Sequence, residues 1–191
     1  MFYTLCVKKF RGLFVAGILT VGIGAGMAAT FLPGYLFPRR YSTEVEKYAR
    51  EYGLEENFVY AVIKAESNFD PNAVSYRGAC GLMQIMPTTG EWCAESMGMD
   101  SFAEEMLFDP EINIQLGCWY LALLVDHFDG SLTTAAAAYN AGIGNVSRWI
   151  SEGGSTDLEV IPFRETEGYL KKIQLYHKIY DDMYGGTKKT V

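Results

Sequence analysis

One glutamate of this chain stands at the end of an apolar helical stripe, and this placement restricts the fold more than any other feature. The residues three, four and seven positions before Glu66 are all isoleucine or valine, the spacing of a helix face that packs on a core. One turn away lie Val62 and Asp70, so neither neighbour offers a cation. A carboxyl group in such surroundings keeps its proton to higher pH, as a general acid requires.

Helix signals continue through the rest of the chain after residue 40, where no alternating pattern long enough for a strand occurs. Asp109-Pro110-Glu111 is a typical helix start and predicts a long buried helix. Ser131 is the expected N-cap of the alanine-rich helix that follows, and a last helix is expected from about Glu165. Thr43 and Glu46 have the spacing of a capping box for the first helix of this region. These signals predict an all-α fold.

Charge is distributed unevenly along the chain, and this excludes one class of partner. Residues 1–40 contain five basic residues and no acidic ones. This leaves 11 basic and 23 acidic residues, a net charge of −12, for residues 41–191. Nucleic-acid binding needs a basic surface, so we expect no nucleic-acid partner.

The residues from Gly12 to Leu32 form an uncharged run of 21, long enough to span the hydrocarbon core of a membrane. Three basic residues precede this run, as is typical of a positive-inside start. We therefore expect residues 1–40 to be a membrane anchor with a short linker, and residues 41–191 to be the functional domain. The alternative is cleavage near Gly26-Met27-Ala28, which would release a secreted protein.

The cysteines and histidines give no motif for a metal site. Any two of Cys80, Cys93 and Cys118 could pair in an oxidising compartment, and three buried free thiols are an equally good interpretation. The only histidines, His127 and His177, lie fifty residues apart on separate helical segments. We expect neither a metal nor an organic cofactor.

Three ordered motifs resemble the soluble lytic transglycosylase catalytic domain, glycoside hydrolase family 23. The first spans residues 66–87, the second is Ala138-Tyr139-Asn140-Ala141-Gly142, and the third spans residues 161–166 together with Tyr169. The match covers about residues 42–184. It implies an all-α, lysozyme-like lytic transglycosylase domain, here preceded by an N-terminal transmembrane helix.

The resemblance also implies a reaction on peptidoglycan. Glu66 would protonate the oxygen that links N-acetylmuramic acid to N-acetylglucosamine, while the N-acetyl group of the sugar stabilises the positive centre. Deprotonated Glu66 would then take the proton of the 6-hydroxyl, so that a 1,6-anhydromuramoyl end forms without water. The resemblance implies seven substrate-binding residues, namely Ser75, Gln84, Met86, Tyr139, Asn140, Glu165 and Tyr169.

Several of these residues also have an ordinary structural interpretation. A loop serine such as Ser75 can simply bond backbone groups. Asn140 can be the C-terminal cap of its helix, and Glu165 can complement the dipole of the last helix. The tryptophans, by contrast, are expected in the core rather than in sugar contact; they are Trp92, Trp119 and Trp149.

The expected protein is a membrane-anchored lytic transglycosylase that acts outside the cytoplasmic membrane. A goose-type lysozyme would keep the fold and Glu66 but admit water, and the reducing end of the product distinguishes the two. An inactive glycan-binding scaffold is the alternative from another class, and the joint presence of Glu66, Ser75, Gln84 and Glu165 argues against it. An adaptor that works through residues 12–32 alone leaves all three motifs unexplained.

Overall fold

The computed structural model describes residues 32–153, 158 and 161–185. Contacts divide the chain into two units, Met1–Arg39 and Arg40–Val191. Among the described residues of the first unit, 32–36 are helical. A search of the described part of the chain finds no helix that is both long and apolar enough to cross a membrane. The predicted span at residues 12–32 lies outside that part, apart from Leu32, so it stays a prediction.

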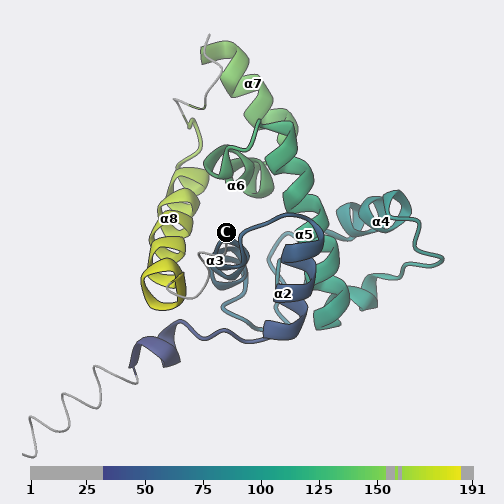
Figure 1. Cartoon of the computed structure of the whole chain (residues 1–191). Helices are drawn as coiled ribbons and strands as arrows, with labels where there is room; N and C mark the ends of the chain where they lie inside the picture. The colour runs from purple at the N-terminus through teal and green to yellow at the C-terminus, as the bar shows by residue number, and fades with distance from the viewer. Residues whose placement is uncertain (1–31, 154–157, 159–160, 186–191) are drawn as a thin grey trace, which may run out of the picture. The chain divides into compact units, whose positions relative to one another are not determined.

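The second unit is helical, as the sequence predicts, and its described residues contain no strand beyond isolated bridges in the loop after α3. Figure 1 shows α3 between α2 and α8, with α6 packed against α5, α7 and α8. The elements in chain order are α2 (Ser42–Glu51), α3 (Glu56–Glu66), α4 (Pro87–Ser96), the 3-10 helix η1 (Glu104–Phe108), α5 (Pro110–His127), α6 (Leu132–Ala141), α7 (Ile143–Gly153) and α8 (Arg164–Tyr184).

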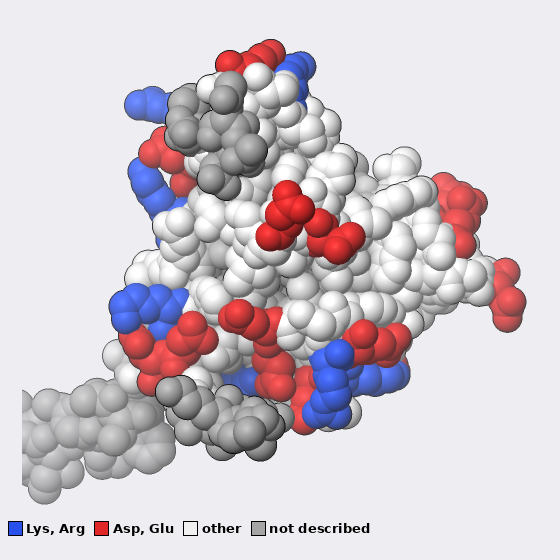
Figure 2. Space-filling view, turned by 45° about the horizontal axis from the view of Figure 1, so that its top comes forward, with Lys and Arg blue, Asp and Glu red and all other residues white. Residues whose placement is uncertain are grey.

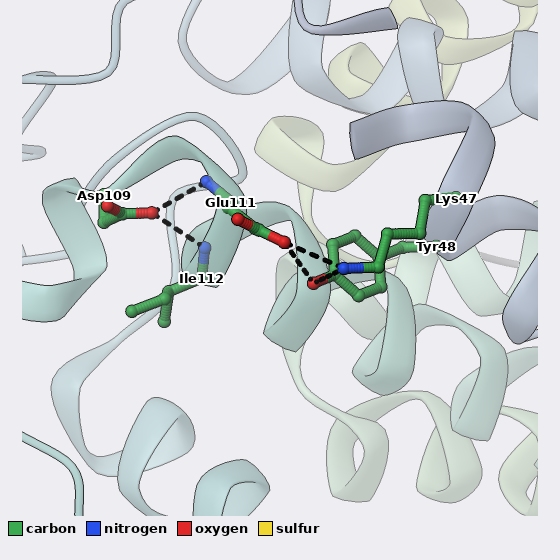
Figure 3. A network of polar contacts seen from close by, with 5 residues as sticks. All are labelled: Lys47, Tyr48, Asp109, Glu111 and Ile112. Carbon is green, nitrogen blue, oxygen red and sulfur yellow. Dashed lines mark hydrogen bonds and ion pairs between the residues drawn. The ribbon is translucent and has the colours of Figure 1, made fainter. Parts of the chain in front are cut away.

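Two of the three predicted helix caps are confirmed. The Asp109 carboxylate accepts hydrogen bonds from the backbone N–H groups of Glu111 (2.9 Å) and Ile112 (3.1 Å), which starts α5 (Figure 3). The Ser131 hydroxyl accepts one from the backbone of Thr134 and starts α6.

The capping box predicted at Thr43 is wrong. Helix α2 begins at Ser42, and Tyr41 before it has a left-handed backbone (φ 56°) and no side-chain cap. Because this turn starts the helix before Thr43, that residue lies inside the first turn and cannot act as the N-cap.

A polar cluster joins α2 to the start of α5. Figure 3 shows Lys47 and Tyr48 of α2 both reaching the Glu111 carboxylate, with N–O and O–O distances of 2.8 and 3.0 Å. The hydrogen bond to Glu111 raises the pKa of Lys47, and the same bond lowers the pKa of Glu111. Since these charged groups are more than half exposed, the cluster fixes the position of the helices more than it stabilises them.

The core is centred on α3 and α8. Every residue from Phe58 to Ile63 is buried, so α3 is enclosed on all sides along its middle. Tyr60 stacks on Tyr180 of α8 with a centroid distance of 5.4 Å. Helix α8 contributes Tyr169, Ile173 and Tyr180 to the same core, and all three are buried. Helix α3 is therefore a rigid base for the carboxylate at its end.

Because the residue before a proline is disfavoured in a helix, Asp70-Pro71 predicts a stop at Asp70, but α3 ends four residues earlier, at Glu66. The chain turns at once because Asn68 and Phe69 adopt left-handed conformations, with φ of 52° and 66°. The Ser67 hydroxyl then donates a 2.8 Å hydrogen bond to the carbonyl of Leu82, which ties the helix end to the following loop.

The cysteines follow one of the two interpretations left open above. Cys80, Cys93 and Cys118 are all buried free thiols. Burial raises the pKa of each, that of Cys93 to about 12, so these thiols remain protonated at neutral pH.

The tryptophans differ from one another in burial. Trp149 is buried, as expected for a core residue, and Trp119 is partly buried. The expectation for Trp92 is wrong, because its side chain is 45% exposed on α4. The physical reason is its position on a helix whose buried face consists of Gly90, Cys93 and Ala94, small residues that leave no room for an indole beneath them.

Candidate active site

Glu66 has the environment that the sequence predicts for it. The residue is partly buried at the last turn of α3, and burial raises the pKa of its carboxyl group from 4.5 to about 7. Two weaker influences lower the pKa, a hydrogen-bond interaction with Tyr169 and the positive charge of Lys172. Within the described residues no salt bridge involves Glu66. Near neutral pH the group can therefore both give and take a proton.

Two tyrosines from later helices lie close enough to Glu66 to interact with its charge. Burial, and secondarily the Glu66 carboxylate, raises the pKa values of Tyr139 on α6 and Tyr169 on α8 far above the usual range. The Tyr139 hydroxyl donates a 2.8 Å hydrogen bond to the carbonyl of Met83. The buried Tyr169 hydroxyl makes no hydrogen bond of standard geometry among the described residues, so Glu66 is the polar group that it faces.

Tyr169→Phe tests the influence of this hydroxyl on Glu66. Removing this hydroxyl takes away a group that favours the charged carboxylate, so we expect the pKa of Glu66 to rise. A hydrogen bond contributes ~0.5–1.5 kcal/mol, so the rise should be at most about one pH unit. NMR titration of the Glu66 side chain measures this value. Tyr180→Phe, about three turns further along α8, is the control and should leave it unchanged. An unchanged or lower pKa in Tyr169→Phe would contradict the assignment.

Ser75 and Gln84 hold the loop between α3 and α4 together. The Ser75 hydroxyl accepts a 2.9 Å hydrogen bond from the backbone of Ala79. The Gln84 amide donates to the carbonyls of Ala73 (3.0 Å) and Gly81 (2.9 Å), and its own backbone is left-handed with φ of 49°. These contacts support the ordinary structural interpretation, and contact with a substrate stays a prediction for both residues.

Asn113 is a residue of this region that the sequence analysis missed. It is fully buried on α5, where its amide oxygen accepts a 2.7 Å hydrogen bond from the backbone of Met83. Its amide nitrogen donates to the carbonyls of Cys80 (3.0 Å) and Leu107 (2.8 Å). A single side chain thus ties the loop to α5 and to η1. The signal in the sequence is a polar residue between the apolar Ile112 and Ile114 of that helix.

The Asn113 amide also explains a glycine of the loop. Gly81 has φ of 77°, and a Cβ atom there would lie 2.2 Å from the Leu107 carbonyl oxygen and 2.3 Å from the Asn113 amide nitrogen. Only glycine fits this close approach.

The remaining predicted residues lie on three different elements. Met86 precedes α4 and is 38% exposed. The Asn140 amide oxygen accepts a 2.9 Å hydrogen bond from the Thr166 hydroxyl, which joins α6 to α8. Glu165 is exposed at the start of α8 and pairs with Arg77 of the loop at 3.6 Å. Among the described residues, Tyr139, Tyr169 and Lys172 interact with Glu66 through charge or hydrogen bonding, so two of the seven predicted residues, Tyr139 and Tyr169, lie close to it.

Comparison with known proteins places this arrangement in a family. The family model described as the transglycosylase SLT domain matches residues 44–161, more than half of the chain. This chain belongs to the transglycosylase SLT domain family. The resemblance stated from the three motifs is thereby confirmed.

Relatives of this SLT domain include longer proteins. It is 34% identical over 155 residues to the soluble lytic murein transglycosylase of Salmonella typhimurium, covering 78% of this chain and 24% of the relative. It is 31% identical over 176 residues to the membrane-bound lytic murein transglycosylase C of Cronobacter sakazakii, covering 78% of this chain and 49% of that relative. The chain therefore spans about a quarter to a half of the length of these relatives.

The fold of the SLT domain matches a solved structure. The X-ray structure of an inactive glutamate-to-glutamine mutant of lytic transglycosylase Slt from Pseudomonas aeruginosa superimposes with a TM-score of 0.73 at 32% identity. The similarity covers 80% of this chain and 25% of that one. The all-helical, lysozyme-like fold predicted from the sequence is thus confirmed.

Proposed function

We propose that this SLT domain is a peptidoglycan lytic transglycosylase that cleaves the β-1,4 bond between N-acetylmuramic acid and N-acetylglucosamine. The observation that carries the proposal is Glu66, a carboxyl group whose pKa is raised to about 7 at the end of a rigid buried helix. Support comes from the relatives named as lytic murein transglycosylases and from the solved relative whose glutamate-to-glutamine mutant is described as inactive.

In the proposed reaction Glu66 acts twice. Its protonated carboxyl gives a proton to the glycosidic oxygen as the bond from that oxygen to C1 of N-acetylmuramic acid breaks. The N-acetyl group of the sugar stabilises the positive C1. The Glu66 carboxylate then takes the proton of the 6-hydroxyl, whose oxygen bonds to C1 and gives the 1,6-anhydro ring. Atoms balance without water, and the carboxyl group ends protonated as it began.

The surroundings of Glu66 suit both steps. A carboxyl group with a pKa near the working pH is protonated often enough to act as an acid and is basic enough to recover the proton. The Tyr169 hydroxyl favours the carboxylate that exists between the two steps. We assign substrate contact to the six other predicted residues, which are Ser75, Gln84, Met86, Tyr139, Asn140 and Glu165.

The proposed place of action is the outer side of the cytoplasmic membrane, with residues 12–32 as a single-pass anchor. The membrane-bound relative supports an anchor, and the soluble relative supports the alternative of a released protein. Figure 2 shows a face on which basic side chains occur in small groups beside acidic ones, without a broad basic area. This distribution supports a glycan rather than a nucleic acid as substrate.

Mass spectrometry of the fragments that the full chain releases from purified peptidoglycan tests the reaction. We expect products lighter by one water than those of hydrolysis, which is the signature of the anhydro end. Products with free reducing ends would show that the bond is hydrolysed, and the function would then be that of a goose-type lysozyme. No release at all would leave the inactive glycan-binding scaffold as the function.

The activity should also depend on pH in a defined direction. General acid catalysis needs protonated Glu66, so kcat/KM should fall about tenfold per pH unit once the pH exceeds the pKa of about 7 in the free protein. The rate of fragment release from about pH 5 to pH 9 measures this decline, the alkaline limb of the pH profile. In Tyr169→Phe the limb should move to higher pH. A rate that rises steadily through neutral pH would exclude Glu66 as the acid.

A further inference from the structure

An exposed group of aromatic rings lies on α4 and α5, outside the residues assigned above. The Trp92 ring contacts the edges of Trp119 and Tyr120, with centroid distances of 5.4 and 6.1 Å and interplanar angles of 66° and 89°. Trp92 is 45% exposed, whereas Trp119 and Tyr120 are only partly so. We call these three residues the aromatic shelf. The two partly buried rings thus fix the Trp92 ring in place while much of its surface faces solvent.

The aromatic shelf continues into the candidate active site. The Tyr120 ring lies 5.5 Å from the ring of Tyr139, centroid to centroid. Tyr139 in turn bonds the Met83 carbonyl and interacts with the Glu66 charge. Ring contacts through Tyr120 and Tyr139 therefore place the exposed Trp92 on the side of the domain next to the surroundings of Glu66.

The chemistry of the shelf selects its ligand. The C–H faces of a pyranose ring pack on an indole face, and a large held aromatic surface contributes much contact at little entropic cost. Nucleic-acid bases also stack on such rings, but Glu91 and Glu95 are exposed on the same helix and would repel phosphates. An uncharged sugar ring meets no such repulsion.

We propose that the aromatic shelf is an outer subsite for the glycan strand, in which a sugar ring packs on Trp92 while the strand passes Tyr139 and reaches Glu66. This inference rests on the proposed glycan substrate and adds the direction in which the strand leaves the catalytic residue. It makes Trp92 a determinant of preference for long strands over short ones.

Binding of N-acetylglucosamine oligomers of two lengths, a trimer and a hexamer, tests the shelf. The full chain with Glu66→Gln serves as the parent, so that binding is measured without cleavage. Adding Trp92→Ala should weaken hexamer binding about tenfold, the loss expected for one stacked ring, and change trimer binding less than about twofold. Trp92→Phe should retain most of the hexamer affinity, and hexamer binding to the parent should shift tryptophan emission to shorter wavelength.

Leu175→Ala, which removes an equally exposed apolar side chain from α8, is the matched control and should bind as the parent does. Equal hexamer affinities of Trp92→Ala and the parent would overturn the proposal, and so would equal losses for both oligomers or no binding by the parent. Free reducing ends from the wild-type protein would overturn the transglycosylase reaction but leave the shelf intact, so the two failures can be told apart.

Discussion

Glu66→Gln should reduce the release of peptidoglycan fragments by about 10²–10⁴-fold, the contribution of a positioned general acid. Glutamine has nearly the shape of glutamic acid but can neither give nor recover the proton in the proposed reaction. The initial rate of fragment release from purified peptidoglycan measures the loss. Glu165→Gln is the matched control, because that exposed carboxylate is assigned to binding and its loss should cost far less.

Measuring the stability of Glu66→Gln tests whether its loss of activity is due to unfolding. Because the folded pKa of about 7 exceeds the unfolded value of 4.5, the folded protein holds a proton that the unfolded chain has lost between these pH values. Wild-type stability therefore falls as pH rises through this window. The variant avoids this cost and should be more stable at about pH 8, by at most about 3 kcal/mol, with the difference vanishing near pH 4. A variant that is less stable at pH 8 would contradict the raised pKa of the Glu66 carboxyl group.

Asn113→Leu should be the most destabilising of the substitutions considered. It leaves the backbone N–H of Met83 and the carbonyl of Leu107 without this partner beside a fully buried side chain, while the carbonyl of Cys80 keeps its hydrogen bond from the backbone of Ile85. Each such group costs ~1–3 kcal/mol, so we expect a loss of about 3 kcal/mol or more in the free energy of unfolding. For a protein of this size the melting temperature would fall by roughly 10 °C. Urea and thermal unfolding measure both quantities.

The control for Asn113 is Asn57→Ala, since the Asn57 amide bonds Asp181 at the surface and its loss should cost less than about 1 kcal/mol. Similar losses in the two variants would show that the loop does not depend on Asn113. A pH-dependent result is expected for Asn113→Asp. Its carboxyl group faces two carbonyl oxygens and must stay protonated to donate, so that variant should lose stability as pH rises.

The parts of the fold that the sequence predicts are those determined by neighbouring residues. Asp109 and Ser131 cap their helices because a short polar side chain reaches a backbone N–H two or three residues on, whatever else the chain does. The left-handed backbone at Tyr41 and Phe69 has no such local cause, whereas Asn68 is of a residue type that often adopts it. The predicted start of α2 and the predicted end of α3 are therefore the places where the helix bounds differ.

The candidate site likewise combines features that the local sequence predicts with features that depend on tertiary packing. Burial raises the pKa of Glu66, and the apolar stripe of its own helix predicts this burial, although packing of α8 on α3 is needed to complete it. The nearness of Tyr139 and Tyr169 depends on the packing of α6 and α8, and only the family resemblance suggested it. Asn113 and the exposure of Trp92 depend on which loop and which small residues pack beside them, and no spacing rule in the sequence contains that information.

The position of α8 has a consequence for the order in which a ribosome makes this protein. Glu66 is synthesised early, but Tyr169 and Lys172 come more than a hundred residues later, on the helix that closes one side of α3. Until that helix has emerged and docked, the carboxyl group remains hydrated and ionised, with the properties of any surface glutamate. A nascent or truncated chain without α8 would therefore carry Glu66 without the raised pKa that keeps its proton near neutral pH, and the proposed catalytic group is completed only after α8 has been made.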